Sequence, residues 1–152
     1  EAKAAGNYLP SILIANEVTG NRYDEAIALD VNGYISEGSG ENVFIVKDKV
    51  LNTAPFTCGL LPGFTRDAVI HFAHDLGYEV VEKRLAREAV YGADEAFFTG
   101  TAAEITPIAS VDGLDVGPGH RGPITEALQQ HFFDYVQGKI EDKYGWLTPC
   151  ND

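Results

Sequence analysis

The stretch Tyr34-Ile-Ser-Glu-Gly-Ser-Gly-Glu-Asn-Val-Phe44 places two carboxylates around two glycines, directly after an Asn32-Gly33 pair. Asn-Gly between two apolar runs is a strong signal for a β-hairpin, and the preceding run 26–31 has the character of a strand. Glu37 is therefore expected where a strand leaves its turn and breaks at Gly38. Glycines at such a point let the backbone approach a ligand closely. A carboxylate held there is suited to meet a cationic ring nitrogen.

By itself this stretch also fits an ordinary surface loop, because exposed glutamates beside glycines are common. Three further segments strengthen the functional interpretation: Lys3-Ala-Ala-Gly-Asn-Tyr8, Leu61-Pro-Gly-Phe-Thr-Arg-Asp67 and Thr99-Gly-Thr-Ala-Ala-Glu-Ile-Thr106. Together the four motifs resemble the pyridoxal-phosphate half of a branched-chain amino acid aminotransferase of the fold-type IV group. The resemblance runs from Lys3 to about Trp146 and is closest to the bacterial enzymes, including the ending Glu141-Asp-Lys-Tyr-Gly-Trp-Leu147.

The composition is that of an ordinary globular domain. The chain has 152 residues, of which 45% are hydrophobic and 22% charged, enough for one domain with its own core. The formal net charge of −12 argues against nucleic acids and anionic membranes as partners, since both bind basic patches. No apolar run approaches the roughly 18 residues of a membrane span. Cys58 and Cys150 show no metal-ligand spacing, which favours a reducing compartment, and we expect a cytoplasmic protein.

The chain contains no methionine and begins at Glu1. We therefore expect the C-terminal part of a longer polypeptide, and the resemblance implies that residues 1–152 are a single cofactor-binding domain. The resemblance implies an N-terminal domain of similar size, either absent or present as a separate chain, and association into at least a dimer.

Apolar spacing predicts helices over 7–18 and 65–76 and from 123 to 138, with a helical turn or two in 85–91. Strands are expected at 25–31, 34–36, 42–47, 50–53, 78–83, 96–99 and 105–111, and loops at 55–63 and 112–122. Because strands outnumber helices and mix hairpins with crossovers, the sequence predicts a mixed α/β fold with helices outside a mixed sheet. The family's cofactor domain implies that this sheet is curled and barrel-like.

The resemblance assigns the covalent chemistry to Lys3, which matches the lysine that forms a Schiff base with pyridoxal 5'-phosphate. Only an amine can form this bond with the aldehyde, and the freed lysine then moves the substrate proton. Tyr8 matches the tyrosine whose hydroxyl bonds the phenolic oxygen of the cofactor, and it also borders the substrate. Without the resemblance, Lys3 would be a solvated terminal lysine and Tyr8 an ordinary core residue.

Glu37 matches the carboxylate that faces the pyridine nitrogen of the cofactor. A carboxylate there keeps the nitrogen protonated, so that the ring accepts electrons from the substrate α-carbon. Glu41 matches a second acidic position of the branched-chain enzymes, and a structural hydrogen bond or an ion pair fits it as well as ligand contact does.

The phosphate group is assigned to two segments. Gly63, Phe64 and Thr65 would supply backbone N–H groups and a hydroxyl at a helix N-terminus, which suits a dianion. Gly100 and Thr101 form the second part, and the N–H groups of Thr101 and Ala102 would hold the substrate carboxylate. Two ordinary roles compete with these assignments: Thr65 as a helix cap and Thr99–Ala103 as a plain turn. Arg66 is interpreted as a surface residue.

Other chemistries fit the sequence less well. His71 and His74 lie one helical turn apart, but no third ligand is near, so no metal site is expected. The resemblance implies that an arginine on the phosphate and the aromatic side-chain pocket come from the N-terminal domain. The expected reaction is transamination of leucine, isoleucine and valine with 2-oxoglutarate. A D-amino acid transaminase, an aminodeoxychorismate lyase and a non-catalytic domain fragment remain as alternatives.

Overall fold

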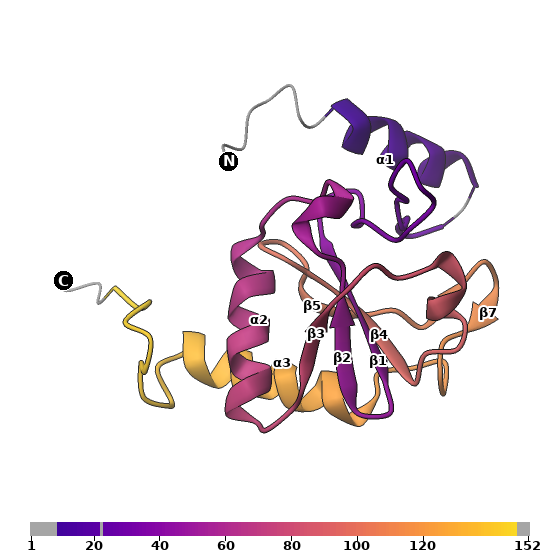
Figure 1. Cartoon of the computed structure of the whole chain (residues 1–152). Helices are drawn as coiled ribbons and strands as arrows, with labels where there is room; N and C mark the ends of the chain where they lie inside the picture. Colours follow the sequence, from indigo (N-terminus) through magenta and orange to yellow (C-terminus); the bar gives the residue numbers. More distant parts are fainter. Residues whose placement is uncertain (1–8, 22, 149–152) are drawn as a thin grey trace.

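A five-stranded mixed sheet forms the centre of the computed structural model, which describes residues 9–21 and 23–148 (Figure 1). The strand order is β3-β2-β1-β4-β5, and only β2 and β3 pair in parallel. The strands are β1 Asn42–Lys47, β2 Val50–Thr53, β3 Val80–Glu82, β4 Glu95–Gly100 and β5 Glu104–Pro107. The expected mixed α/β architecture is confirmed, and the bounds of β1 and β2 are those that the sequence predicted. The barrel-like curl stays a prediction.

Strand β1 lies in the middle of the sheet between β2 and β4, and its first five residues are all buried. A strand covered on both faces needs apolar residues without alternation, as the run 43–46 provides. Phe44 stacks on Phe97 of β4 with ring centroids 5.1 Å apart, which joins the two central strands on one face.

Two helices cover one face of the sheet. These are α2 Phe64–Asp75 and α3 Pro123–Val136, and both contact β4 and each other (Figure 1). Both match predicted helices to within one or two residues. The core between helices and sheet consists of Phe44, Val46, Leu51, Val69, Phe72, Ala73, Phe97, Ile105, Ile124, Leu128 and Tyr135.

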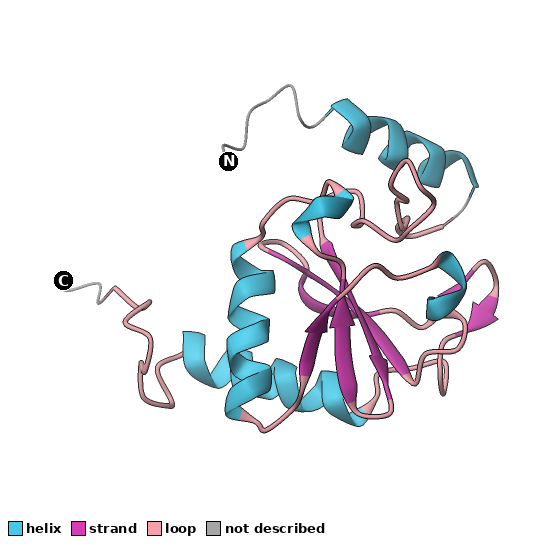
Figure 2. Ribbon diagram, viewed as in Figure 1, coloured by secondary structure: helices cyan, strands magenta, loops and turns pink. Residues whose placement is uncertain are grey.

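The opposite face of the sheet is covered mainly by loops and short elements (Figure 2). Its apolar core includes Ile35, Val43, Ile45, Leu85, Val90, Phe98, Ile108 and Val116. The short elements here are a 3-10 helix, η3 Arg87–Val90, and a two-stranded sheet of β6 Ser110–Val111 and β7 Leu114–Asp115. A second 3-10 helix, η2 Phe56–Cys58, precedes α2.

The hairpin at Asn32-Gly33 is confirmed, but the strands expected on either side are not regular. Segments 25–31 and 34–36 make only isolated bridges, such as Leu29 with Ile35. The Asp30 carboxylate accepts the N–H groups of Asn32 at 2.8 Å and Tyr34 at 2.9 Å. A side chain that takes backbone donors in this way competes with the strand ladder, which shortens the paired region.

The strand expected over 105–111 is confirmed only in part, because β5 ends at Pro107 and a separate short strand, β6, follows. After Ile108 the chain no longer pairs with β4. Strand β6 pairs instead with β7, which lies inside the loop predicted over 112–122. The turn between them is Asp112-Gly113, with φ angles of 53° and 79°. Positive φ at both turn positions matches the twist of a tight hairpin, and Asp-Gly is a favoured pair for it.

Helix α1 Leu9–Asn21 stands at the top of Figure 1, beside the sheet, and none of its residues is buried. The predicted helix over 7–18 is confirmed from Leu9 and continues to Asn21, while residues 7 and 8 lie outside the described part. Within 9–21 and 23–148, none of the helices has the length and apolar character needed to cross a membrane.

The surface assignment of Arg66 is wrong. Its side chain is only 3% exposed and donates to Ala54 O at 3.1 Å and to Glu82 Oε2 at 2.6 Å, while its guanidinium lies 4.7 Å from the ring centroid of Phe56. Arg66 therefore joins α2 to the ends of β2 and β3 instead of facing solvent. Its sequence neighbours do not reveal this, because the partners are ten or more residues away.

The C-terminal segment 139–148 packs against α2 and α3 through two aspartates. Asp75 of α2 accepts hydrogen bonds from Tyr144 OH, at 2.8 Å, and from Lys143. Asp142 accepts from the hydroxyl of Tyr135 in α3 and from the backbone N–H groups of Trp146 and Leu147. Tyr144 and Trp146 stack with ring centroids 4.5 Å apart.

These contacts predict that the tail detaches in acid. The hydrogen bond from Lys143 lowers the pKa of Asp75, and that from Tyr135 lowers the pKa of Asp142. A lowered carboxyl pKa contributes stability above the ordinary value of about 3.9, and this contribution disappears as the pH falls through the lower, folded-state value. We expect the emission of Trp146 to change below about pH 4, before far-ultraviolet circular dichroism is lost. Subtracting the emission of a Trp146→Phe variant isolates the signal of Trp146. In Asp142→Asn, the change of this signal with pH should be smaller. An unchanged emission until global unfolding would contradict the prediction.

Candidate active site

Three connections meet at one end of the sheet, and they carry the predicted site residues that the structure describes. The first is the turn 37–42 before β1, the second is the segment 59–63 that leads into α2, and the third is the turn 100–104 between β4 and β5. Antiparallel pairing sets Asn42 at the start of β1 opposite Thr99 at the end of β4. Residues more than 50 positions apart in the sequence are thus brought together by strand register.

The turn 37–42 is closed by backbone hydrogen bonding. Gly38 N–H donates to Glu41 O at 2.6 Å, and Glu37 bridges to Asn42. Gly38 has no room for a side chain, because a Cβ there would lie 2.7 Å from Glu41 Oε2 and 3.0 Å from the Phe98 ring. The two glutamates that flank the glycines in the sequence therefore lie on one compact turn, beside the end of β4.

The surroundings of this turn disfavour the charged forms of its two glutamates. Burial raises the pKa of Glu37, although the Leu61 N–H group partly opposes the shift. Burial also raises the pKa of Glu41, and the negative charges of Glu25 and Glu37 raise it further. Among the residues that the structure describes, no lysine, arginine or histidine forms an ion pair with Glu37 or Glu41. A bound cationic group would favour their charged forms.

Asn42 and Leu61 belong to this site, although their roles were not anticipated from the sequence. Leu61 N–H donates to Glu37 Oε2 at 2.8 Å, and Asn42 Nδ2 donates to Leu61 O at 2.9 Å. The only sequence signal is that Asn42 is a polar residue at the head of an otherwise apolar strand, where its side chain is 4% exposed.

The start of α2 has the features of an anion site. Gly63 is the N-cap residue, with φ −72° and ψ 137°, and no side chain caps the helix. The interpretation of Thr65 as the helix cap is therefore wrong, because Thr65 is half-buried inside the first turn and does not cap the helix. The N–H groups at such an end carry a partial positive charge. Phe64 beside them is 87% exposed.

The turn after β4 completes the arrangement. Gly100 lies against the first turn, since a Cβ there would sit 3.4 Å from Glu41 Cγ. Thr101 and Ala102 are exposed at the tip, and the chain returns as β5 at Glu104. Thr99, directly before Gly100, is 1% exposed, and its hydroxyl has no hydrogen-bond partner in the described part of the protein.

Lys3 and Tyr8 lie outside the described residues, so their positions relative to this site stay predictions. His71 contacts the rings of Tyr144 and Trp146, with centroids 5.0 and 5.5 Å away. Within residues 9–21 and 23–148 no group of three or more histidine, cysteine, aspartate or glutamate side chains has the arrangement to hold a metal ion.

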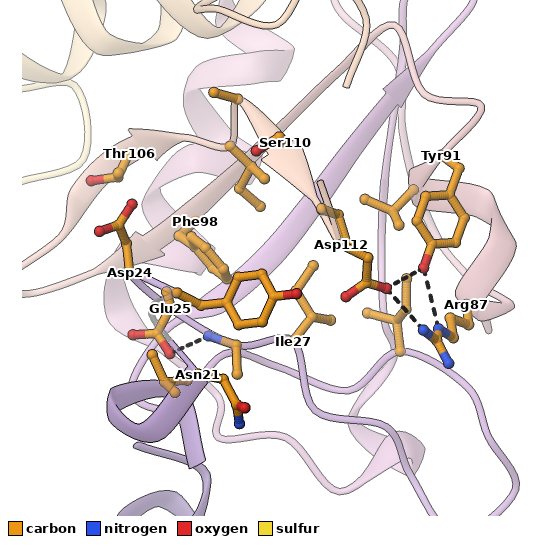
Figure 3. A pocket seen from close by; sticks show the side chains of 18 of the residues that line it. Asn21, Asp24, Glu25, Ile27, Arg87, Tyr91, Phe98, Thr106, Ser110 and Asp112 are labelled. Carbon is orange, nitrogen blue, oxygen red and sulfur yellow. Dashed lines mark hydrogen bonds and ion pairs between the residues drawn. The ribbon is translucent and has the colours of Figure 1, made fainter. Parts of the chain in front are cut away.

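A separate cavity of about 660 Å³ lies on the loop-covered face of the sheet (Figure 3). It extends from Asp24 and Glu25, past Phe98, to a hydrogen-bonded group of Arg87, Tyr91 and Asp112. None of the predicted site residues lines it. Within the described residues, the three converging connections instead gather a carboxylate without an ion-pair partner, a helix end without a side-chain cap and the unbonded Thr99 hydroxyl.

A carboxylate at one side and a helix N-terminus at the other suit a ligand that carries both a protonated ring nitrogen and a phosphate. The family model of amino-transferase class IV matches residues 2–111, and the chain belongs to this family.

Its relatives include branched-chain-amino-acid aminotransferases. The chain is 60% identical over 150 residues to that of Salmonella typhimurium, covering 99% of this chain and 48% of the relative, and 51% identical to that of Pseudomonas aeruginosa, covering 97% and 48%. Among solved structures, the Escherichia coli branched-chain amino acid aminotransferase superposes with a TM-score of 0.96 at 59% identity, over 99% of this chain and 51% of that one. The Thermobaculum terrenum branched-chain amino acid aminotransferase in its PLP form superposes with a TM-score of 0.93 at 44% identity, over 97% of this chain and 48% of that one. The chain spans about half the length of the curated relatives it matches.

Proposed function

We propose that this chain is the cofactor-binding domain of a pyridoxal-phosphate-dependent transaminase that acts on branched-chain L-amino acids. The observation that carries the proposal is the position of Glu37, which is half-buried without a cationic partner in the described residues and is hydrogen-bonded to the segment leading into the uncapped end of α2. The names of its close relatives support the substrate class. Residues 1–152 are one domain, and the enzyme is completed by an N-terminal half.

Three groups of residues would hold the cofactor. Glu37 would bind the ring nitrogen, and Gly63, Phe64, Thr65, Gly100 and Thr101 would bind the phosphate. Tyr8 would bond the phenolic oxygen, and Lys3 would carry the covalent bond. When bound, pyridoxal 5'-phosphate supplies an aldehyde that takes up the substrate amino group and a protonated ring that accepts electron density.

The residues of the chain then control protons and orientation. Lys3 Nζ would take the proton from the substrate α-carbon and deliver it to the C4′ carbon of the cofactor. The Glu37 carboxylate keeps a proton on the ring nitrogen. The backbone N–H groups of Thr101 and Ala102 orient the substrate carboxylate, since the tip of this turn is exposed. 2-Oxoglutarate serves as the acceptor and leaves as glutamate.

The active protein in this proposal is a cytoplasmic homo-oligomer, at least a dimer, with the N-terminal half supplying the remaining pocket residues. Substrate assays on the full-length protein test the reaction. We expect glutamate to form from 2-oxoglutarate with leucine, isoleucine and valine, and no comparable rate with D-alanine or aminodeoxychorismate. A faster reaction with either of the latter would assign the chain to another activity of the same family.

A further inference from the structure

Asn42 links two parts of the proposed cofactor site that lie far apart in the sequence. It receives no role from the motifs, yet its side chain is almost fully buried at the point where the three connections meet. Its Nδ2 donates to Leu61 O at 2.9 Å, while Leu61 N–H donates to Glu37 Oε2 at 2.8 Å. The backbone of Leu61 is thus held on both sides by residues of the turn 37–42.

The sheet makes this turn a rigid support. Asn42 is the first residue of β1 and pairs with Thr99 of β4, and it also bridges to Glu37. Asn42 is therefore placed by strand pairing at the end of the central strand β1, and Glu37 is tied to it by the bridge. Leu61, in contrast, lies in a segment without regular structure between η2 and α2, and these two hydrogen bonds tie its backbone to the turn 37–42.

A second contact joins Asn42 to the start of α2. A Cβ on Gly63 would lie 2.3 Å from Asn42 Oδ1, a distance that no side chain tolerates without displacement. The carboxamide of Asn42 thus occupies the space that any larger residue at Gly63 would need. Helix α2 begins at the next residue, Phe64, so the location of its free N–H groups follows from where Asn42 holds Leu61 and Gly63.

We propose that Asn42 is a positioning residue that fixes the spacing between the Glu37 carboxylate and the N-terminus of α2. This inference rests on the proposed function. The ring nitrogen and the phosphate of the cofactor are joined by a rigid ring and a short linker, so the groups that bind them need one fixed separation. Asn42 sets that separation through Leu61 and touches neither end of the cofactor.

Comparing two ligands in the full-length apoprotein tests this role. Pyridoxal 5'-phosphate needs both ends of the site, whereas pyridoxal lacks the phosphate. Asn42→Ala loses one buried hydrogen bond, which lets the start of α2 move. We therefore expect the Kd of pyridoxal 5'-phosphate to rise about tenfold and the Kd of pyridoxal to rise less than about twofold. Asn42→Leu has a similar size but no group that can donate to Leu61 O, and we expect at least the same selective loss.

Asn52→Ala is the matched control. Asn52 is likewise a buried asparagine, 5% exposed on β2, and its Nδ2 donates to backbone carbonyls at Val50 and Ile45. Its loss should lower thermal stability and leave the ratio of the two Kd values unchanged. If Asn42→Ala does not fold, Asn42→Leu decides. An unchanged ratio in the folded Asn42 variant would overturn the inference while leaving the proposed function intact. Failure of the unaltered full-length protein to bind pyridoxal 5'-phosphate would overturn both.

Discussion

Replacing Lys3 with alanine should abolish turnover of the full-length enzyme, by at least about ten-thousandfold. The reason is that Lys3 has two proposed roles at once, since its amine binds the cofactor covalently and later carries the substrate proton. The absorbance of the lysine-bound cofactor should disappear with the activity. Borohydride reduction followed by peptide mass spectrometry measures this directly, and the unaltered protein should carry a pyridoxyl group on Lys3.

Lys3→Arg is the control that separates the effect of the positive charge from the effect of the covalent bond to the cofactor. It keeps a positive charge, but a guanidinium does not form the covalent bond with the aldehyde, so we expect it to be as inactive as Lys3→Ala. A pyridoxyl group on another lysine in the unaltered protein would contradict the assignment. Restored activity in Lys3→Arg would show that only charge is needed at this position.

Replacing Glu37 with glutamine should lower kcat by about a hundredfold to a thousandfold while changing cofactor affinity by less than about fivefold. The geometry gives a reason for this separation. The glutamine carbonyl oxygen can still accept the Leu61 N–H, now at 2.8 Å from Glu37 Oε2, so the segment that leads into α2 keeps its position. Only the negative charge is lost, which in the proposed role holds a proton on the ring nitrogen.

Glu37→Ala removes both the charge and the acceptor for Leu61. We therefore expect it to lose kcat to a similar extent and to bind pyridoxal 5'-phosphate more weakly than Glu37→Gln does. Glu25→Gln is the matched control, because Glu25 is a neighbouring carboxylate that bonds Ser39 and Ala26 and has no proposed contact with the cofactor. Equal losses of kcat and affinity in Glu37→Gln would count against its role at the ring nitrogen.

Local patterns predicted the elements that depend on local interactions. The apolar run 43–46 and the spacing in 65–76 and 123–136 predicted β1, α2 and α3 closely, because burial on a strand or a helix face repeats with a short period. The same patterns were less successful at 25–36 and 105–111. In the first, Asp30 diverts backbone donors, and in the second the chain turns away from β4 to pair with β7.

The sequence by itself determined which residue types are available for chemistry: an amine at Lys3, a carboxylate between glycines at Glu37, and a glycine before the helix at Gly63. Only the tertiary structure decided that Arg66 is buried, that Thr65 is not a cap, and that Asn42 holds Leu61. The physical reason is that these features depend on contacts between residues 12 or more positions apart, or on where a helix begins. Such contacts follow from strand register and helix packing, which no local pattern of residues encodes.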